Sequence, residues 1–202
     1  MSISCTARKG EQGFTLLETT FAILILGIGL LGAAALLAQM FGNSVQSRYM
    51  STESLLASEK LDDLNRLASS DPALMPSPAT SLTTDATAVQ TVGAVTETVA
   101  YYDTVQISAG NGAMQEVITG TDAAGNTIYM VNSHTPNGNI SSTTSPTAPA
   151  APDAQVLTFK RRWLVEGDTP IVGARRITVQ VNLVGGAANA TFQTSMIRSF
   201  VQ

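Results

Sequence analysis

The amino-acid sequence predicts an α+β fold, in which a long N-terminal helix packs on a C-terminal antiparallel β-sheet. An uncharged and mostly apolar run of membrane length lies near the N-terminus and continues into a helical pattern up to residue 70. Residues 156–201 instead contain strand-like runs separated by turns, and residues 176–183 alternate apolar and polar side chains at the two-residue period of β-strands. With 202 residues, the chain has room for this helix and one domain of ordinary size.

Residues 14–47 form the apolar half of the expected helix. Fourteen Phe, Leu and Ile residues lie between Phe14 and Phe41, and each favours membrane insertion by about 0.3–0.6 kcal/mol. Their sum, about 4–8 kcal/mol in favour of insertion, exceeds the roughly 2.5–3.5 kcal/mol that a carboxylate costs at the membrane centre. We therefore expect a single membrane span even with Glu18 ionised.

Residues 48–70 form an amphipathic continuation of the same helix. Small or apolar side chains recur there at spacings of three and four residues, at Met50, Ser54, Ala57, Leu61, Leu64 and Ala68. This period predicts one stripe that is buried against a head domain. Because the first proline is Pro72, the helix can continue without a break to about residue 69. Its length would be about 80 Å.

A six-residue motif stands where a polar leader, residues 1–13, meets the apolar run. The motif is Gly13-Phe14-Thr15-Leu16-Leu17-Glu18. A secretory signal peptide has its small-residue cleavage site after the apolar region, whereas Gly13 precedes that region here. Cleavage after Gly13 would therefore remove the leader and leave the helix attached to the chain.

This motif resembles the processing site of type IV prepilins and of the related pseudopilins. The resemblance implies that a prepilin peptidase cuts after Gly13 and that the new terminus, Phe14, is N-methylated. It also implies that Glu18 neutralises the terminal amine of a neighbouring subunit in a filament. A partly desolvated cation and anion are each costly when unpaired, so such a pair would set the register between subunits. Without the resemblance, Glu18 could equally lie at the membrane surface of an ordinary anchor.

The remaining residues, 71–202, are expected to form a β-rich head. Two stretches rich in Pro, Ser, Thr and Ala, near 71–87 and 134–153, are predicted to be flexible loops. Strand-like runs lie at about residues 98–108, 113–119, 127–131, 156–165, 176–183 and 191–201. The last three are expected to pair as an antiparallel meander. The residues of Asp122–Asn126 are typical of a hairpin turn between two strands. A calcium loop is the less favoured interpretation, because the segment lacks the alternating acidic ligands of such a loop.

The segment around Trp163 also resembles the C-terminal end of PilV-type minor pilins, where R-x-W-x-V precedes a turn and a Val/Thr-rich strand. Trp163 is interpreted as a core anchor between sheet and helix. The adjacent basic triplet, Lys160-Arg161-Arg162, is interpreted as a solvated strand face. His134, the sole histidine, is expected to be exposed and to have no acidic neighbour.

The composition argues against several classes of function. The only cysteine, Cys5, lies in the leader, so the processed chain would have no thiol and no internal disulfide. One histidine and no thiol leave no usual nucleophile–base pair and few zinc sites. A formal net charge of −4 without a basic cluster argues against a nucleic-acid surface. We therefore expect no enzymatic activity, no metal and no cofactor.

These features predict a minor pilin of a type IV pilus, which is incorporated into the filament or primes its assembly. Its expected partners are other pilin subunits, which it contacts through the N-terminal helix, and the prepilin peptidase. It would lie in the inner membrane before assembly and in a cell-surface pilus afterwards. Two alternatives stay open: a type II secretion pseudopilin in the periplasm, and a membrane-anchored extracytoplasmic binding protein.

Overall fold

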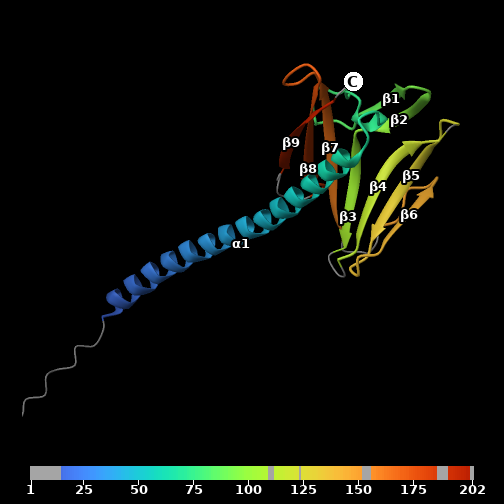
Figure 1. The fold of residues 1–202 in the computed structure, drawn as a ribbon. Helices are drawn as coiled ribbons and strands as arrows, with labels where there is room; N and C mark the ends of the chain where they lie inside the picture. The colour runs from blue at the N-terminus through green and yellow to red at the C-terminus, as the bar shows by residue number, and fades with distance from the viewer. Residues whose placement is uncertain (1–14, 109–111, 123, 152–155, 186–190, 201–202) are drawn as a thin grey trace, which may run out of the picture. The chain divides into compact units, whose positions relative to one another are not determined.

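A computed structural model describes residues 15–108, 112–122, 124–151, 156–185 and 191–200. These residues combine one long helix with antiparallel strands, as predicted (Figure 1). The helix, α1, runs from Leu16 to Arg66. The chain divides into two compact units, Met1–Val45 and Gln46–Gln202, and each is described by itself.

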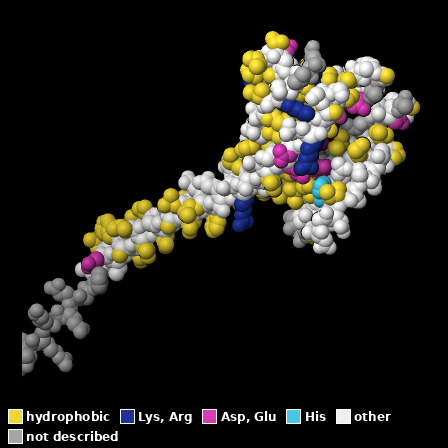
Figure 2. Space-filling model, viewed as in Figure 1, with side chains coloured by type: hydrophobic (Ala, Val, Ile, Leu, Met, Phe, Trp, Pro, Cys, Tyr) yellow, Lys and Arg dark blue, Asp and Glu magenta, His cyan; other side chains and the backbone are white. Residues whose placement is uncertain are grey.

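In the first unit, α1 presents its large apolar side chains to the surroundings. Figure 2 shows hydrophobic side chains along this part of the helix, and Leu16, Phe21 and Phe41 are all more than half exposed. Among the described residues, α1 is the one helix that is long and apolar enough to cross a membrane. The most apolar stretch of 18 residues within it contains no buried residue.

In the second unit, seven of the described strands form one antiparallel sheet in the order β6-β5-β4-β3-β7-β8-β9, and β1 and β2 form a separate hairpin. A short 3-10 helix, η1 (Pro72–Leu74), follows α1. The strand bounds are β1 Thr87–Val92, β2 Val95–Ala100, β3 Tyr102–Ser108, β4 Met114–Thr121, β5 Thr127–His134, β6 Ile140–Ser145, β7 Val156–Gly167, β8 Ala174–Leu183 and β9 Thr191–Ser199. The predicted C-terminal meander is confirmed by the pairing of β7 with β8 and of β8 with β9.

The core of the second unit lies between the sheet and the later turns of α1. One face of β7 and β8 supplies alternating buried side chains, at Phe159, Trp163, Val165, Ile177, Val179 and Val181. These residues form one cluster with Leu56, Ala57 and Leu64 of α1. The prediction that Trp163 anchors the core between sheet and helix is confirmed.

The buried stripe of α1 differs from the predicted one. Ala57 and Leu64 are buried as expected, but Met50 is 42% exposed, and the helix ends at Arg66, before Ala68. The buried positions are Glu53, Leu56, Ala57, Lys60 and Leu64. Two of these are charged, so a search for apolar periodicity could not find them.

The predicted loop at 134–153 contains a strand, which corrects the prediction. Residues of β6 pair with β5 from His134↔Ile140 to Tyr129↔Ser145. Nearly all of β6 is exposed and its side chains are mostly Ser and Thr. An edge strand without a buried face has no apolar alternation, so the sequence pattern missed it.

One strand boundary also differs from the prediction, and one predicted turn agrees with it. The run predicted over 98–108 is two strands, β2 and β3, which meet at Tyr101. The hairpin turn predicted at Asp122–Asn126 is confirmed, because Asp122 Oδ1 accepts hydrogen bonds from the backbone N–H groups of Ala124 and Asn126.

Candidate functional site

The predicted processing site is described from Thr15 onward, since Gly13 and Phe14 lie outside the described residues. Thr15 directly precedes α1 and acts as its N-cap. The Thr15 carbonyl oxygen accepts hydrogen bonds from the N–H groups of Glu18 at 3.0 Å and Thr19 at 3.2 Å. Its Oγ1 atom also accepts from the Glu18 N–H, at 3.3 Å. A threonine at this position satisfies backbone donors that otherwise lack partners at a helix start.

Glu18 lies in the first turn of α1, where its side chain is exposed. A carboxylate is favoured there because the N-terminal end of a helix carries a partial positive charge. Glu18 is the only charged residue of the helix before Arg48, and the described residues provide no ion-pair partner for it. A cation from outside the subunit could therefore reach this carboxylate.

The second unit contains a buried cluster of charges centred on Arg161, which corrects the interpretation of that residue as solvated. Arg161 is fully buried in β7. Its Nε donates to Asp103 Oδ1 at 2.6 Å, and its Nη2 donates to Asp103 Oδ2 at 2.8 Å and to Glu116 Oε1 at 2.6 Å. The side chains of a strand alternate between its two faces, so Arg161 lies on the inner face with Phe159 and Trp163.

Lys60 joins this cluster from α1. Its Nζ lies 2.9 Å from Asp103 Oδ2 and 4.2 Å from the centroid of the Trp163 ring. Burial opposes ionisation of Asp103, but the charges of Lys60 and Arg161 outweigh burial and hold the pKa of this carboxyl below its usual value. The cluster therefore links the helix, β3, β4 and β7 through paired charges.

The other two members of the basic triplet, Lys160 and Arg162, lie on the outer face of the sheet, but they are paired and only partly exposed. Arg162 Nε donates to Asp85 Oδ1 at 2.9 Å, and Lys160 Nζ forms an ion pair with Asp85 Oδ2. Burial opposes ionisation of Asp85, but the hydrogen bonds from Lys160 and Arg162 prevail and lower the pKa of its carboxyl.

His134 is half-buried and has an acidic neighbour, which corrects both parts of the prediction. Its Nε2 lies 3.8 Å from Glu116 Oε2. Asn132 Nδ2 donates to the same carboxylate oxygen at 3.3 Å. In the described part of the chain, no group of three or more His, Cys, Asp or Glu side chains is arranged to hold a metal ion.

Residues 8–34 match the prokaryotic N-terminal methylation motif. The chain carries a prepilin-type motif. This match supports a type IV pilin-like family, which includes pilins and pseudopilins, and it points to a structural subunit rather than an enzyme. No curated protein and no solved structure matches the chain.

The prepilin-type motif and the charge cluster differ in how far the sequence reveals them. The motif is contiguous, so its residues are recognisable without a structure. The cluster joins Lys60, Asp103, Glu116 and Arg161, which are far apart in the chain. Lys60 lies outside the predicted apolar stripe, so the helical periodicity gave no signal for the cluster.

Proposed function

We propose that this protein is a minor pilin of a type IV pilus, cleaved after Gly13, N-methylated at Phe14, and then incorporated into a filament or used to prime one. The observation that supports this most directly is the methylation motif at residues 8–34. It leads into a helix whose apolar side chains are exposed in the isolated subunit.

In a filament outside the membrane, neighbouring helices would have to cover these side chains. Leaving one large apolar side chain in water costs about 1.5–3 kcal/mol relative to burying it, and α1 exposes many of them between Leu16 and Val45. Apolar burial has little directional preference. In this proposal the ion pair between Glu18 and the Phe14 amine of a neighbouring subunit supplies the register.

Intact mass spectrometry of the protein from its native membrane tests the processing step. We expect a chain that lacks residues 1–13 and carries one extra methyl group, and we expect the full-length chain in cells without the prepilin peptidase. An unprocessed chain in both kinds of cell would contradict the proposal and favour a simple membrane anchor.

Substitutions at Glu18 test the register step separately. Glu18→Gln keeps the shape of the side chain but removes its charge, and Glu18→Asp keeps the charge. We expect both variants to be cleaved, and only Glu18→Gln to lose most of its incorporation into sheared fibres, measured against the amount in the membrane. Normal incorporation of Glu18→Gln would exclude the charge pair.

A type II secretion pseudopilin is the second candidate, because pseudopilins share this motif. Cell fractionation separates the two functions. Recovery of the processed chain in sheared surface fibres supports the pilus. Its retention in the envelope, together with a secretion defect in the deletion strain, supports the pseudopilus.

A further inference from the structure

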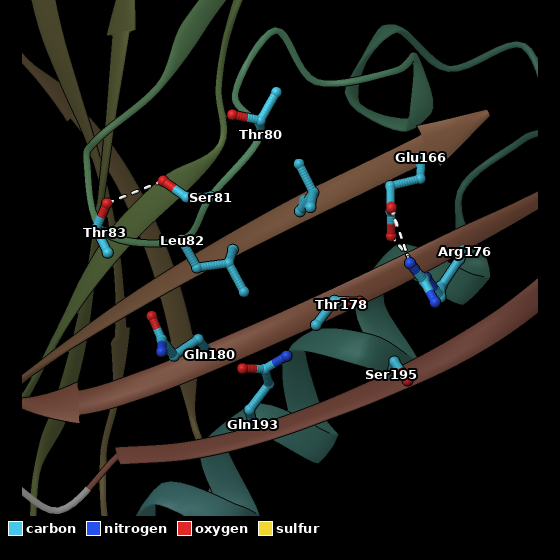
Figure 3. A pocket seen from close by; sticks show the side chains of 11 residues that line it. Thr80, Ser81, Leu82, Thr83, Glu166, Arg176, Thr178, Gln180, Gln193 and Ser195 are labelled. Carbon is cyan, nitrogen blue, oxygen red and sulfur yellow. Dashed lines mark hydrogen bonds and ion pairs between the residues drawn. The ribbon is translucent and has the colours of Figure 1, made fainter. Parts of the chain in front are cut away.

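A polar pocket lies on the outer face of β7, β8 and β9, opposite the face that carries the core (Figure 3). Its cavity volume is about 450 Å³, which is within the usual size of small-molecule sites. The segment Thr80–Thr83 forms one wall, and side chains from the three strands form the floor.

Thr178 lies at the floor of this pocket and has an unusual environment. In the sheet it stands between Leu164 of β7 and Ser195 of β9, on the outer face. It is nevertheless only 6% exposed, because the Thr80–Thr83 segment covers this part of the sheet. No described residue is a hydrogen-bond partner of its hydroxyl. Its hydroxyl oxygen is nevertheless not one of the described buried polar atoms that lack a partner. The hydroxyl is therefore open to the pocket, where it can exchange hydrogen bonds with a ligand.

Two glutamines extend the polar floor. Gln180 and Gln193 are directly opposite each other in the pairing of β8 with β9, and both line the pocket. Neither amide is hydrogen-bonded to another described residue. Each amide offers two donors and one acceptor, and each hydroxyl offers a donor and an acceptor. The pocket can therefore exchange hydrogen bonds in both directions with a ligand.

The charges of the pocket cancel. Among the described residues that line it, the charged ones are Glu166 and Arg176. They form a bidentate pair with Nε–Oε2 at 2.6 Å and Nη2–Oε1 at 2.8 Å. Leu82 and Leu164 add apolar surface to the lining. A charged ligand would lose hydration here without gaining an opposite charge, so the pocket favours a neutral ligand.

We infer that this pocket binds a neutral saccharide, and that Thr178, Gln180 and Gln193 are its hydrogen-bonding residues. A saccharide combines closely spaced hydroxyls with apolar C–H faces, which matches the mixture of amides, hydroxyls and leucines. An extended peptide would instead pair its main chain with a sheet edge, whereas these groups project from the face of the sheet. The inference does not depend on the proposed function.

The test uses the full-length protein in a detergent without a sugar headgroup. The protein is applied to an array of neutral oligosaccharides built from hexoses and N-acetylhexosamines, with sialylated and sulfated glycans for comparison. We expect binding to neutral glycans. The absence of a neutral ligand, or binding that requires a charged sugar, would overturn the inference.

Variants then locate the site by calorimetric titration of the best array ligand. Thr178→Val is nearly isosteric and removes one hydrogen-bonding group, so we expect a three- to tenfold loss of affinity, about the net effect of one hydrogen bond. Gln193→Leu, at an exposed position, should cause a similar loss of affinity. If Thr178→Val does not fold, the affinity of Gln193→Leu shows whether the ligand binds in this pocket. Thr104→Val, in β3 and outside the pocket, should bind normally. Equal losses in all three variants would refute this location.

Discussion

Arg161 stands in a run of three basic residues, yet it is the most buried of them and the centre of the charge cluster. Buried pairs of this kind add little net stability compared with apolar side chains of similar volume, but removal of one partner is costly because the other charge is left buried. Asp103 is fully buried and Glu116 is nearly so. The positive charge of Arg161 therefore offsets part of the cost of burying both negative charges.

Arg161→Met should lower the free energy of unfolding by about 3–5 kcal/mol, because it leaves the buried Glu116 without its arginine partner and Asp103 with Lys60 alone. Arg176→Met is the matched control, since Arg176 also pairs bidentately with a carboxylate in the same sheet but its side chain is 45% exposed. The control should cost at most about 1 kcal/mol. Urea denaturation of the micelle-bound protein measures both values, and equal losses would contradict the interpretation.

Asp103 should make the stability of the head sensitive to acid. Its folded-state pKa lies below the usual value, so its carboxylate stabilises the fold above about pH 4, the pKa of an unfolded aspartate. That contribution is lost as the pH falls through the folded pKa.

Asp103→Asn should therefore flatten the dependence of the unfolding free energy on pH below about pH 4, although the variant is less stable at neutral pH. Glu166→Gln, in the exposed pair with Arg176, should change this dependence only slightly because solvent screens that pair. An unchanged acid dependence in Asp103→Asn would show that other groups control the transition.

At the scale of elements, the later turns of α1 pack tightly against the sheet. Ala57 is fully buried within the cluster that contains Trp163. Glu53, also buried, accepts a hydrogen bond from the backbone N–H of Leu183 at 3.1 Å. The helix thus contacts the sheet through a small side chain and through polar pairs, as well as through Leu56 and Leu64.

Ala57→Leu should destabilise the head by about 1–3 kcal/mol, because a well-packed core does not accept extra methylene groups without strain. Ser58→Leu places the same side chain at the next position, which is exposed, and should change stability by no more than about 0.5 kcal/mol. Thermal unfolding followed by tryptophan fluorescence compares them. A loss with Ser58→Leu as large as with Ala57→Leu would show that leucine affects the helix itself.

At the scale of the whole molecule, α1 is one continuous helix with two kinds of surface. Between Leu16 and Val45 it contains four glycines, at Gly27, Gly29, Gly32 and Gly42, and an added Cβ at any of them would meet no atom within 4 Å. Nothing within the described subunit therefore requires glycine there. We interpret these glycines as sites of close helix packing between subunits.

Replacing Gly27, Gly29 and Gly32 together with alanine should stabilise the helix of the isolated subunit, by about 1 kcal/mol per site. The same variant should enter filaments less efficiently, because the added methyl groups keep neighbouring helices apart. Circular dichroism on heating measures the first effect, and the content of sheared fibres measures the second. Gly42→Ala is a control outside the Gly27–Gly32 segment, and undiminished incorporation of the triple variant would exclude the packing role.

The sequence by itself determined the features that depend on neighbouring residues. The apolar half of α1, the motif from Gly13 to Glu18 and the strands of the C-terminal meander each have a contiguous pattern. Local periodicity determines which side chains share a face, so Trp163 could be placed in the core before its neighbours were known.

Only the tertiary structure decided how polar residues are used. Arg161 is buried because Asp103 and Glu116, from distant parts of the chain, compensate its charge. Thr178 is buried because the Thr80–Thr83 segment covers the outer face of the sheet, and β6 forms through backbone pairing that requires no apolar pattern. In each case the environment of a polar residue depends on segments that folding brings from elsewhere in the chain, which the periodicity of a single segment cannot reveal.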